Sequence, residues 1–364
     1  MHHCFLVQAY VGLCLTMPVG TAAVAEPPTV RYTVTDLGTL GGATSIALGI
    51  NDRGQVVGGA QTAHGVTHAF LWERGRMTDL GAAAPDAISI ARAVNNIGQA
   101  VGESSVPHGP MHALIWQHGR ATDWGTLGDS GGAVNAINDH GQVVGQLCTP
   151  SGERRAFRWE AGPVQKSDTL GGNLISAKAI NNRGQVIGAM NLGHGDDIDV
   201  HGFVWAAHRI VELGAFAAQG INDHGQAVGA VSGGANPYSS AAMWLDGQMT
   251  RLPTPNSTCS IANDINNWGQ IVGSGGIVAG GARRSEATSH AFCWAGGKCV
   301  DLNGRIAADA GWLLEDAEHI NARGQIVGLG EHGGKQRAFL LTPIGGSSEN
   351  GDRRGRERHP SAHL

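Results

Sequence analysis

A nine-residue phrase that recurs seven times constrains the fold of this chain more than any other feature. In its fullest form it reads Ile-Asn-x-x-Gly-Gln-x-Val-Gly, and the mean spacing of its copies is 45 residues. Its asparagines are Asn51, Asn95, Asn138, Asn181, Asn222, Asn266 and Asn321. This period lies in the range of propeller blades and above that of a one-coil β-solenoid. No unit contains a window of 3.6-residue periodicity, which excludes helical repeats.

Each unit reads as four short strands. A small residue lies four positions before the phrase asparagine, as at Ala47 and Ala91, and small residues suit the crowded strand nearest a propeller axis. The Asn-x-x-Gly that follows predicts a tight turn. The third strand is a His-Ala-Phe-Leu-Trp phrase, and the fourth ends in Asp-Leu-Gly. Because both faces of a blade are buried when blades stack, we expect the recurring Phe and Trp side chains to form core rather than a sugar-stacking site.

The sequence therefore predicts an all-β fold, a seven-bladed β-propeller of four-stranded blades, over residues 26–343. The 57 glycines and a charged content of only 15% fit many short strands joined by turns. The seventh unit stops after residues 337–341 without an Asp-Leu-Gly strand, whereas residues 30–38 contain an isolated one. We expect this N-terminal strand to pair into the last blade, which closes the ring and removes its exposed edges.

The two ends of the chain have different compositions from the repeats. Residues 1–25 resemble a signal peptide, with an apolar run followed by Ala23-Val24-Ala25. A membrane anchor is the competing interpretation, but the run is short and contains polar residues. We predict a secreted protein, extracellular or periplasmic, without a membrane span after signal removal. Residues 344–364 predict a disordered Arg-rich tail. A net charge of −5 gives no basic footprint for nucleic acid.

Four cysteines remain after the expected cleavage: Cys148, Cys259, Cys293 and Cys299. An oxidising compartment permits bridges among them, and the sequence leaves all three connectivities open. Cys293 and Cys299 belong to one predicted hairpin but face opposite sides of it. A local bridge between them is therefore disfavoured by geometry.

These phrases resemble the HAF-repeat family, predicted extracellular bacterial proteins that are named for motifs such as His68-Ala69-Phe70 and His290-Ala291-Phe292. The resemblance extends from Val30 to about Pro343. Some members of that family end in a sorting motif with a membrane helix, and the last twenty residues of this chain contain no apolar helix. The resemblance implies an extracellular propeller-like protein, and it brings no assigned activity or catalytic residues.

The invariant turns and the variable loops fall on opposite rims of the predicted propeller. Since variable loops on a rigid scaffold commonly carry binding, we expect the variable-loop rim to be the functional face. The ligand-binding candidates are two aromatic residues in variable loops, Tyr238 and Trp312, and two histidines of recurring His-Gly pairs, His64 and His108. Turn chemistry also explains the His-Gly pairs. For the histidine that opens each third strand, we expect a structural hydrogen bond to a neighbouring blade.

One variable loop has the composition of a metal site. It contains His194, Asp196, Asp197, Asp199 and His201. Its oxygens suit Ca²⁺, and its two imidazoles with one carboxylate suit Zn²⁺. The loop matches no established calcium motif, and a solvated acidic loop is the preferred interpretation. We therefore expect no cofactor.

The function that these features favour is a non-catalytic binding module. Its expected partner is a glycan, a peptide or another surface molecule, bound by a monomer through the variable-loop rim. One alternative is a carbohydrate-active hydrolase or lyase, for which Asp196, Asp197, Asp199 and Glu286 are the available acids. The other is a purely structural protein of an envelope or matrix. No catalytic signature that we searched for occurs in the chain.

Overall fold

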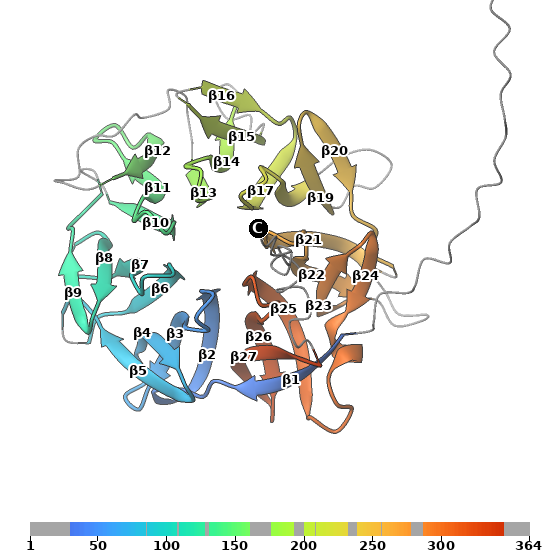
Figure 1. The fold of residues 1–364 in the computed structure, drawn as a ribbon. Coiled ribbons are helices and arrows are strands. Elements are labelled where there is room, and N and C mark those ends of the chain that lie inside the picture. The colour runs from blue at the N-terminus through green and yellow to red at the C-terminus, as the bar shows by residue number, and fades with distance from the viewer. Residues whose placement is uncertain are drawn as a thin grey trace, which may run out of the picture.

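The computed structural model describes residues 30–345, apart from 85, 108, 128–130, 161–175, 193–199, 208, 232–238, 256 and 278–286. In this range the chain forms seven antiparallel sheets around one axis, which confirms the predicted seven-bladed propeller (Figure 1). The predicted signal peptide and tail lie outside the described residues. No helix in the described part of the chain has the length and hydropathy to cross a bilayer.

The strands of each blade follow one another from the axis outward (Figure 1). The innermost strands are β2 (Gly41–Ile50), β6 (Ser89–Val94), β10 (Gly132–Ile137), β13 (Ser176–Ile180), β17 (Phe216–Ile221), β21 (Ser257–Ile265) and β25 (Trp312–Ile320). The second strands are β3 (Val56–Thr62), β7 (Ala100–Ser104), β11 (Val143–Cys148), β14 (Val186–Asn191), β18 (Ala227–Val231), β22 (Ile271–Ile277) and β26 (Ile326–His332).

The third strands are β4 (Thr67–Glu73), β8 (His112–Gln117), β12 (Arg154–Trp159), β15 (Val200–Ala206), β19 (Ser240–Leu245), β23 (Thr288–Ala295) and β27 (Lys335–Ile344). The outermost strands are β5 (Arg76–Gly81), β9 (Arg120–Asp123), β16 (Arg209–Glu212), β20 (Gln248–Arg251), β24 (Lys298–Asp301) and β1 (Arg31–Asp36). The third blade has three described strands, β10 to β12. A 3₁₀ helix, η2 (Leu302–Arg305), follows β24.

The ring closes as predicted, by pairing the first strand with the last. β1 runs antiparallel to β27 over six residue pairs, from Arg31 opposite Ile344 to Asp36 opposite Phe339. A side chain of the first blade strengthens the joint: the Ser45 hydroxyl accepts a hydrogen bond from the Ala338 amide at 3.0 Å. The outermost strand of the last blade thus comes from the opposite end of the chain, and no edge of β27 is left unpaired on that side.

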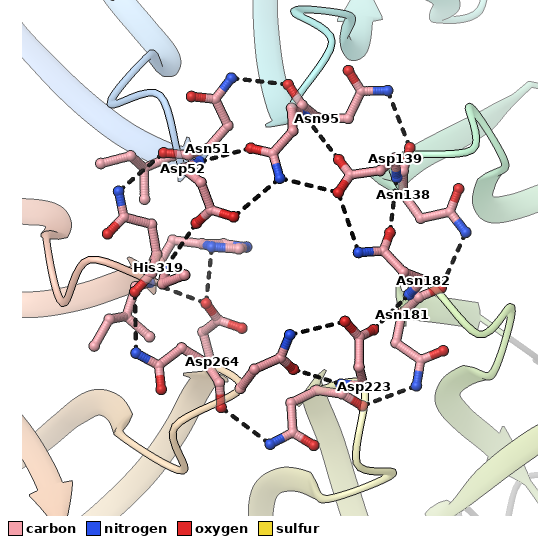
Figure 2. A pocket seen from close by; sticks show the side chains of 18 of the residues that line it. Asn51, Asp52, Asn95, Asn138, Asp139, Asn181, Asn182, Asp223, Asp264 and His319 are labelled. Atoms are coloured by element: carbon pink, nitrogen blue, oxygen red, sulfur yellow. Dashed lines mark hydrogen bonds and ion pairs between the residues drawn. The ribbon is translucent and has the colours of Figure 1, made fainter. Parts of the chain in front are cut away.

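The seven phrase asparagines form a continuous ring of hydrogen bonds around the axis, which we call the asparagine ring (Figure 2). The Nδ2 of each donates to the backbone carbonyl of the asparagine in the next blade at 2.8–3.0 Å, and the last bond runs from Asn321 to Asn51. Every member is buried. At Asn51 the Oδ1 also accepts from the amides of Arg53 and Gln55, so the side chain shapes its own turn as well.

Apolar side chains fill the spaces between adjacent blades. One cluster, for example, combines Ala47 and Phe70 of the first blade with Val327, Ala338 and Leu340 of the last. The phenylalanines of the third strands are buried throughout the described blades: Phe70, Phe157, Phe203, Phe292 and Phe339. The expectation that the recurring aromatic residues form core is therefore confirmed.

The histidines that open the third strands differ from the expectation. Each pairs within its own blade, not with a neighbouring blade, so that prediction is wrong. His68 Nδ1 lies 2.9 Å from the Asp79 carboxylate, and His112 Nδ1 lies 2.8 Å from that of Asp123. The same pairing joins His201 to Glu212 and His290 to Asp301. The physical reason is the antiparallel register, which brings the start of the third strand beside the end of the fourth.

The cysteines Cys293 and Cys299 lie on adjacent strands, β23 and β24, and no disulfide joins them. The register places Cys293 opposite Val300 and Cys299 opposite Trp294, as the predicted opposite faces require. Burial raises the pKa of the Cys293 thiol to about 12, which keeps it protonated at neutral pH.

The asparagine ring predicts that two neighbouring asparagines, Asn138 and Asn182, contribute unequally to the unfolding free energy. Replacing Asn138 with Ala removes its bond to the Asn181 carbonyl and the bonds that shape its own turn, so we expect a loss of about 2–4 kcal/mol in unfolding free energy. The control is Asn182→Ala, at an exposed position of the same turns where the last blade already has an alanine, Ala322. For this variant we expect a loss in unfolding free energy of about 1 kcal/mol or less. Denaturant unfolding measures both, and equal losses would contradict the role of the ring.

The pairing of β1 with β27 predicts what happens when β1 is removed. Deleting residues 30–38 exposes the edge of β27, so we expect a lower melting temperature and concentration-dependent self-association in light scattering. Addition of a peptide with the sequence of residues 30–38 should restore the monomer. Thr33→Ala, which leaves the backbone pairing in place, is the control. A deleted protein that stays monomeric at the parental melting temperature would show that closure does not depend on this strand.

Candidate functional site

Every innermost strand contains a β-bulge at the residue three positions before its phrase asparagine. The register with the second strand shifts there in all seven blades, for example between Ala47 and Gly49. The bulged residues are Leu48, Arg92, Asn135, Lys178, Gln219, Asn263 and Glu318, and all seven line one cavity of about 200 Å³. We call them the lumen ring. A bulge redirects a side chain, and here it turns one residue of each blade toward the axis.

The glycine that ends the phrase makes room for the bulge. A Cβ at Gly58 would lie 2.0 Å from the Ile46 carbonyl oxygen, and a Cβ at Gly328 would lie 1.9 Å from the Asp316 carbonyl oxygen. No side chain fits at such a distance. The second strand therefore needs glycine at this position so that the bulged inner strand can approach it.

The next residue along each inner strand lies between the lumen ring and the turns. In five blades it is Gly or Ala, whereas Asp264 and His319 occupy the same position in the last two. We call this pair the waist. His319 Nδ1 lies 2.8 Å from Asp264 Oδ2, and the same oxygen accepts from the Ile320 amide at 3.0 Å. Both residues line the cavities on either side of them.

On the turn side of the waist lies a second cavity of about 180 Å³. Its rim consists of the residues that follow the phrase asparagines, which we call the mouth ring: Asp52, Asn96, Asp139, Asn182, Asp223, Asn267 and Ala322. Figure 2 shows that these carboxylates and amides bond to one another. The Asn96 amide, for example, donates to both Asp52 and Asp139 at 3.0 Å. Because these polar groups satisfy each other, the mouth ring reinforces the joints between blades.

The lumen ring carries charges of both signs. Arg92 Nε donates to Glu103 at 3.1 Å, so this cation is already paired. Lys178 and Glu318 form no hydrogen bond and no ion pair with any residue that the structure describes. These two unpaired side chains distinguish the lumen ring from the mouth ring.

Burial governs the titration of these groups. It lowers the pKa of Lys178, and the neighbouring Arg92 lowers it further. Burial and the charge of Asp316 raise the pKa of Glu318 to about 7, against the opposing influence of His319 and Arg92. Burial alone would lower the pKa of His319, but Asp264 and Glu318 outweigh it and raise the pKa. The channel thus combines a carboxyl group that titrates near neutrality, Glu318, with two cationic side chains, Arg92 and Lys178.

Most of the candidates chosen from sequence lie away from the channel or outside the described residues. Outside them fall Tyr238, His108, His194, Asp196, Asp197, Asp199 and Glu286. His64 is exposed in the turn between β3 and β4. His201 lies on β15 beside Glu212, as described above. Among the residues that the structure describes, no three His, Cys, Asp or Glu side chains form a group that could hold a metal ion.

Trp312 differs from its expected position in a loop. It is the first residue of strand β25, and its ring stacks on that of His332 at 4.6 Å with an interplanar angle of 7°. It also meets Phe339 edge to face at 6.1 Å. These contacts anchor the start of the last inner strand in the core of its blade.

The lumen ring itself was not among the sequence candidates, although the repeat contains a signal for it. The position three residues before the phrase asparagine holds Leu, Arg, Asn, Lys, Gln, Asn and Glu in the successive units. Its neighbours on either side are mostly Ala or Gly. A single variable position between small residues in a regular repeat indicates a side chain outside the apolar core.

Comparisons with known proteins support the fold. No family model and no curated protein matches the chain, so the resemblance to the HAF-repeat family stays a prediction. A puromycin-hydrolyzing peptidase from Mycobacterium tuberculosis matches with a TM-score of 0.52 at 11% identity over 86% of this chain, which spans 55% of the peptidase.

Two archaeal structures also match. The β-propeller domain of the Trilobed protease from Pyrococcus furiosus has a TM-score of 0.49 at 9% identity, covering 85% of this chain and 93% of the domain. The acylaminoacyl peptidase from Pyrococcus horikoshii has a TM-score of 0.46 at 9% identity, covering 86% of this chain and 52% of the peptidase. At such identities the likeness concerns the propeller fold alone.

The raised pKa of Glu318 predicts a pH-dependent cost of folding. Below pH 4.5 the carboxyl is protonated in both the folded and the unfolded chain, and stability falls as the pH rises toward 7, because the unfolded chain releases this proton first. Glu318→Gln removes that cost. We expect it to raise the unfolding free energy by about 1–3 kcal/mol more at pH 8 than at pH 4.

Denaturant unfolding at both pH values measures this difference. The matched control is Glu160→Gln, an exposed carboxyl outside the channel, which should show no such difference. An equal effect of Glu318→Gln at the two pH values would contradict the raised pKa.

Proposed function

We propose that this protein is a non-catalytic binding scaffold that takes a small polar ligand into the lumen ring from the variable-loop rim. The observation that carries the proposal is the repeated bulge, which turns one residue of every inner strand into a common cavity. The bulged residues differ from blade to blade while the surrounding frame repeats. Residues that vary on a constant frame are typical of a recognition surface.

The topology supports access from the variable-loop side. Each inner strand runs from a variable loop to its phrase turn, and the lumen ring lies three residues before the phrase asparagine. The waist, formed by Asp264 and His319, lies between the lumen ring and the turns. A ligand that reaches the lumen ring from the variable loops therefore does not have to pass these two side chains.

Unpaired charges in the cavity favour binding over a purely structural role. Lys178 and Glu318 line the cavity and form no ion pair with any described residue, although Arg92 and His319 act on the pKa of Glu318 from a greater distance. Such groups reduce stability, and proteins retain them mostly where they serve function. A structural envelope protein gains nothing from them.

A hydrolase or lyase is the second candidate, because Glu318 titrates near neutrality beside the His319–Asp264 pair. A carboxyl with such a pKa can act as a general acid or base. Asp264, however, is already in an ion-pair contact with His319 and accepts from the Ile320 amide, which fits a positioning role better than catalysis. We therefore favour binding without turnover. Export from the cell, a monomeric state and a glycan or peptide as the surface partner remain part of the proposal.

The test is a thermal-shift screen of small charged and polar molecules against the protein and its Lys178→Gln variant. A ligand at about 100 times its Kd should stabilise the protein by about 2.7 kcal/mol, and Lys178→Gln should reduce this shift. Lys335→Gln, at the exposed start of β27, is the matched control and should retain it.

Mass spectrometry of the recovered ligand distinguishes the two candidate functions. Unchanged ligand supports a binding scaffold, and a cleaved or eliminated product would overturn it in favour of an enzyme. Ligands whose stabilisation is the same in Lys178→Gln would place the binding site outside the channel.

A further inference from the structure

The lumen ring has its opposite charges on opposite sides of the channel. Arg92, Asn135 and Lys178 belong to three consecutive inner strands, β6, β10 and β13, and form one arc. Glu318 belongs to β25, and β10 and β13 are the inner strands farthest from β25 around the ring (Figure 1). The cavity therefore has a cationic side and an anionic side.

Lys178 and Glu318 do not pair with each other directly. The Lys178 ammonium and the Glu318 carboxylate do not approach within the 4.0 Å of an ion pair. The space between them is the cavity of about 200 Å³. Lys178 is accessible from the cavity and Glu318 is half-buried beside it, so each gains from a partner of opposite charge that enters this space.

The remaining residues of the ring limit what such a partner can be. A simple anion that approaches Lys178 also meets Glu318 and Asp264, which repel it. A simple cation that approaches Glu318 meets Arg92 and Lys178. Only a molecule with both charges satisfies the two sides of the cavity at once, because each of its ends then lies away from the charge that would repel it.

We propose that the lumen ring binds a small zwitterion, with its carboxylate toward Lys178 and Arg92 and its protonated amine toward Glu318. The chemical class is that of free amino acids, ω-amino acids and short peptides. Leu48 and the methyl groups of Ala93, Ala136 and Ala179 provide an apolar wall for a short aliphatic chain between the two charges. This inference rests on the proposed function and specifies the ligand of that same site.

The test is calorimetric titration of the full chain with a graded series of zwitterions. The probes are glycine, β-alanine, 4-aminobutanoate, 6-aminohexanoate and diglycine. Hexanoate and hexylamine are the controls, since each keeps one charge and the chain length of 6-aminohexanoate. We expect at least one zwitterion to bind at least about tenfold more tightly than both single-charge controls, the ratio that about 1.4 kcal/mol of added interaction produces.

Two variants test which residue binds which end of the ligand. Lys178→Gln and Glu318→Gln should each weaken the best zwitterion by about tenfold or more. Glu318→Gln should, in addition, strengthen hexanoate, because it removes the repelling carboxylate. The matched controls Lys335→Gln and Glu160→Gln, both exposed outside the channel, should leave the affinity unchanged. Circular dichroism of each variant verifies that it is folded.

The outcomes separate this inference from the proposed function. If hexanoate or hexylamine binds as tightly as every zwitterion, or if Glu318→Gln leaves the best zwitterion unchanged, the zwitterion assignment is overturned while a channel ligand remains. If no zwitterion binds but other molecules from the wider screen bind in a Lys178-dependent way, the assignment is likewise overturned. If no molecule of either set binds in the channel, the proposed function fails together with it.

Discussion

The structure depends on a closed circuit of seven side-chain hydrogen bonds. Each asparagine amide donates across a blade boundary to the next asparagine carbonyl, and the last of these bonds returns to the first blade. Because every donor is buried, an unmade bond would cost the full desolvation of a polar group. This requirement fixes the angle between neighbouring blades at the turn rim, and apolar packing then fills the spaces behind it. A different number of blades would change that angle and break the circuit.

The same repeat that closes the ring also opens the cavity at the lumen ring. The phrase ends in a glycine whose missing side chain lets the bulged inner strand approach, and the bulge turns one residue per blade toward the axis. The asparagines and glycines of the motif maintain the frame, whereas the bulged positions, among them Lys178 and Glu318, line the cavity.

Much of the fold could be predicted from the sequence because its determinants are local. The 45-residue spacing, the turn residues and the isolated strand before the first repeat were enough for the blade number and for closure. The pairing of His68 with Asp79 was also accessible, since the same eleven-residue separation recurs at His112, His201 and His290. The sequence prediction instead placed the partner of each of these histidines in a neighbouring blade.

The candidate site could not be predicted in the same way. Two-residue alternation assumes a regular strand, and a bulge adds one residue that alternation does not anticipate. A periodicity argument therefore cannot predict the lumen ring. A comparison of the repeat units position by position can identify it. Trp312 shows a related error in strand length. Strand β25 begins at this residue, earlier than the turn spacing indicated, so a residue expected in a loop packs, partly buried, against the core of the last blade.

The bulged positions have a wider consequence for how such a chain can change. Each of the seven side chains lines the lumen, so its replacement alters what the channel attracts. Asn135 and Asn263 also donate to backbone carbonyls of the next blade, so these two positions contribute to the blade boundaries as well. Under the binding function that we propose, the other five positions can change one at a time on a constant backbone. Each repeat then contributes one residue to the selectivity of the channel.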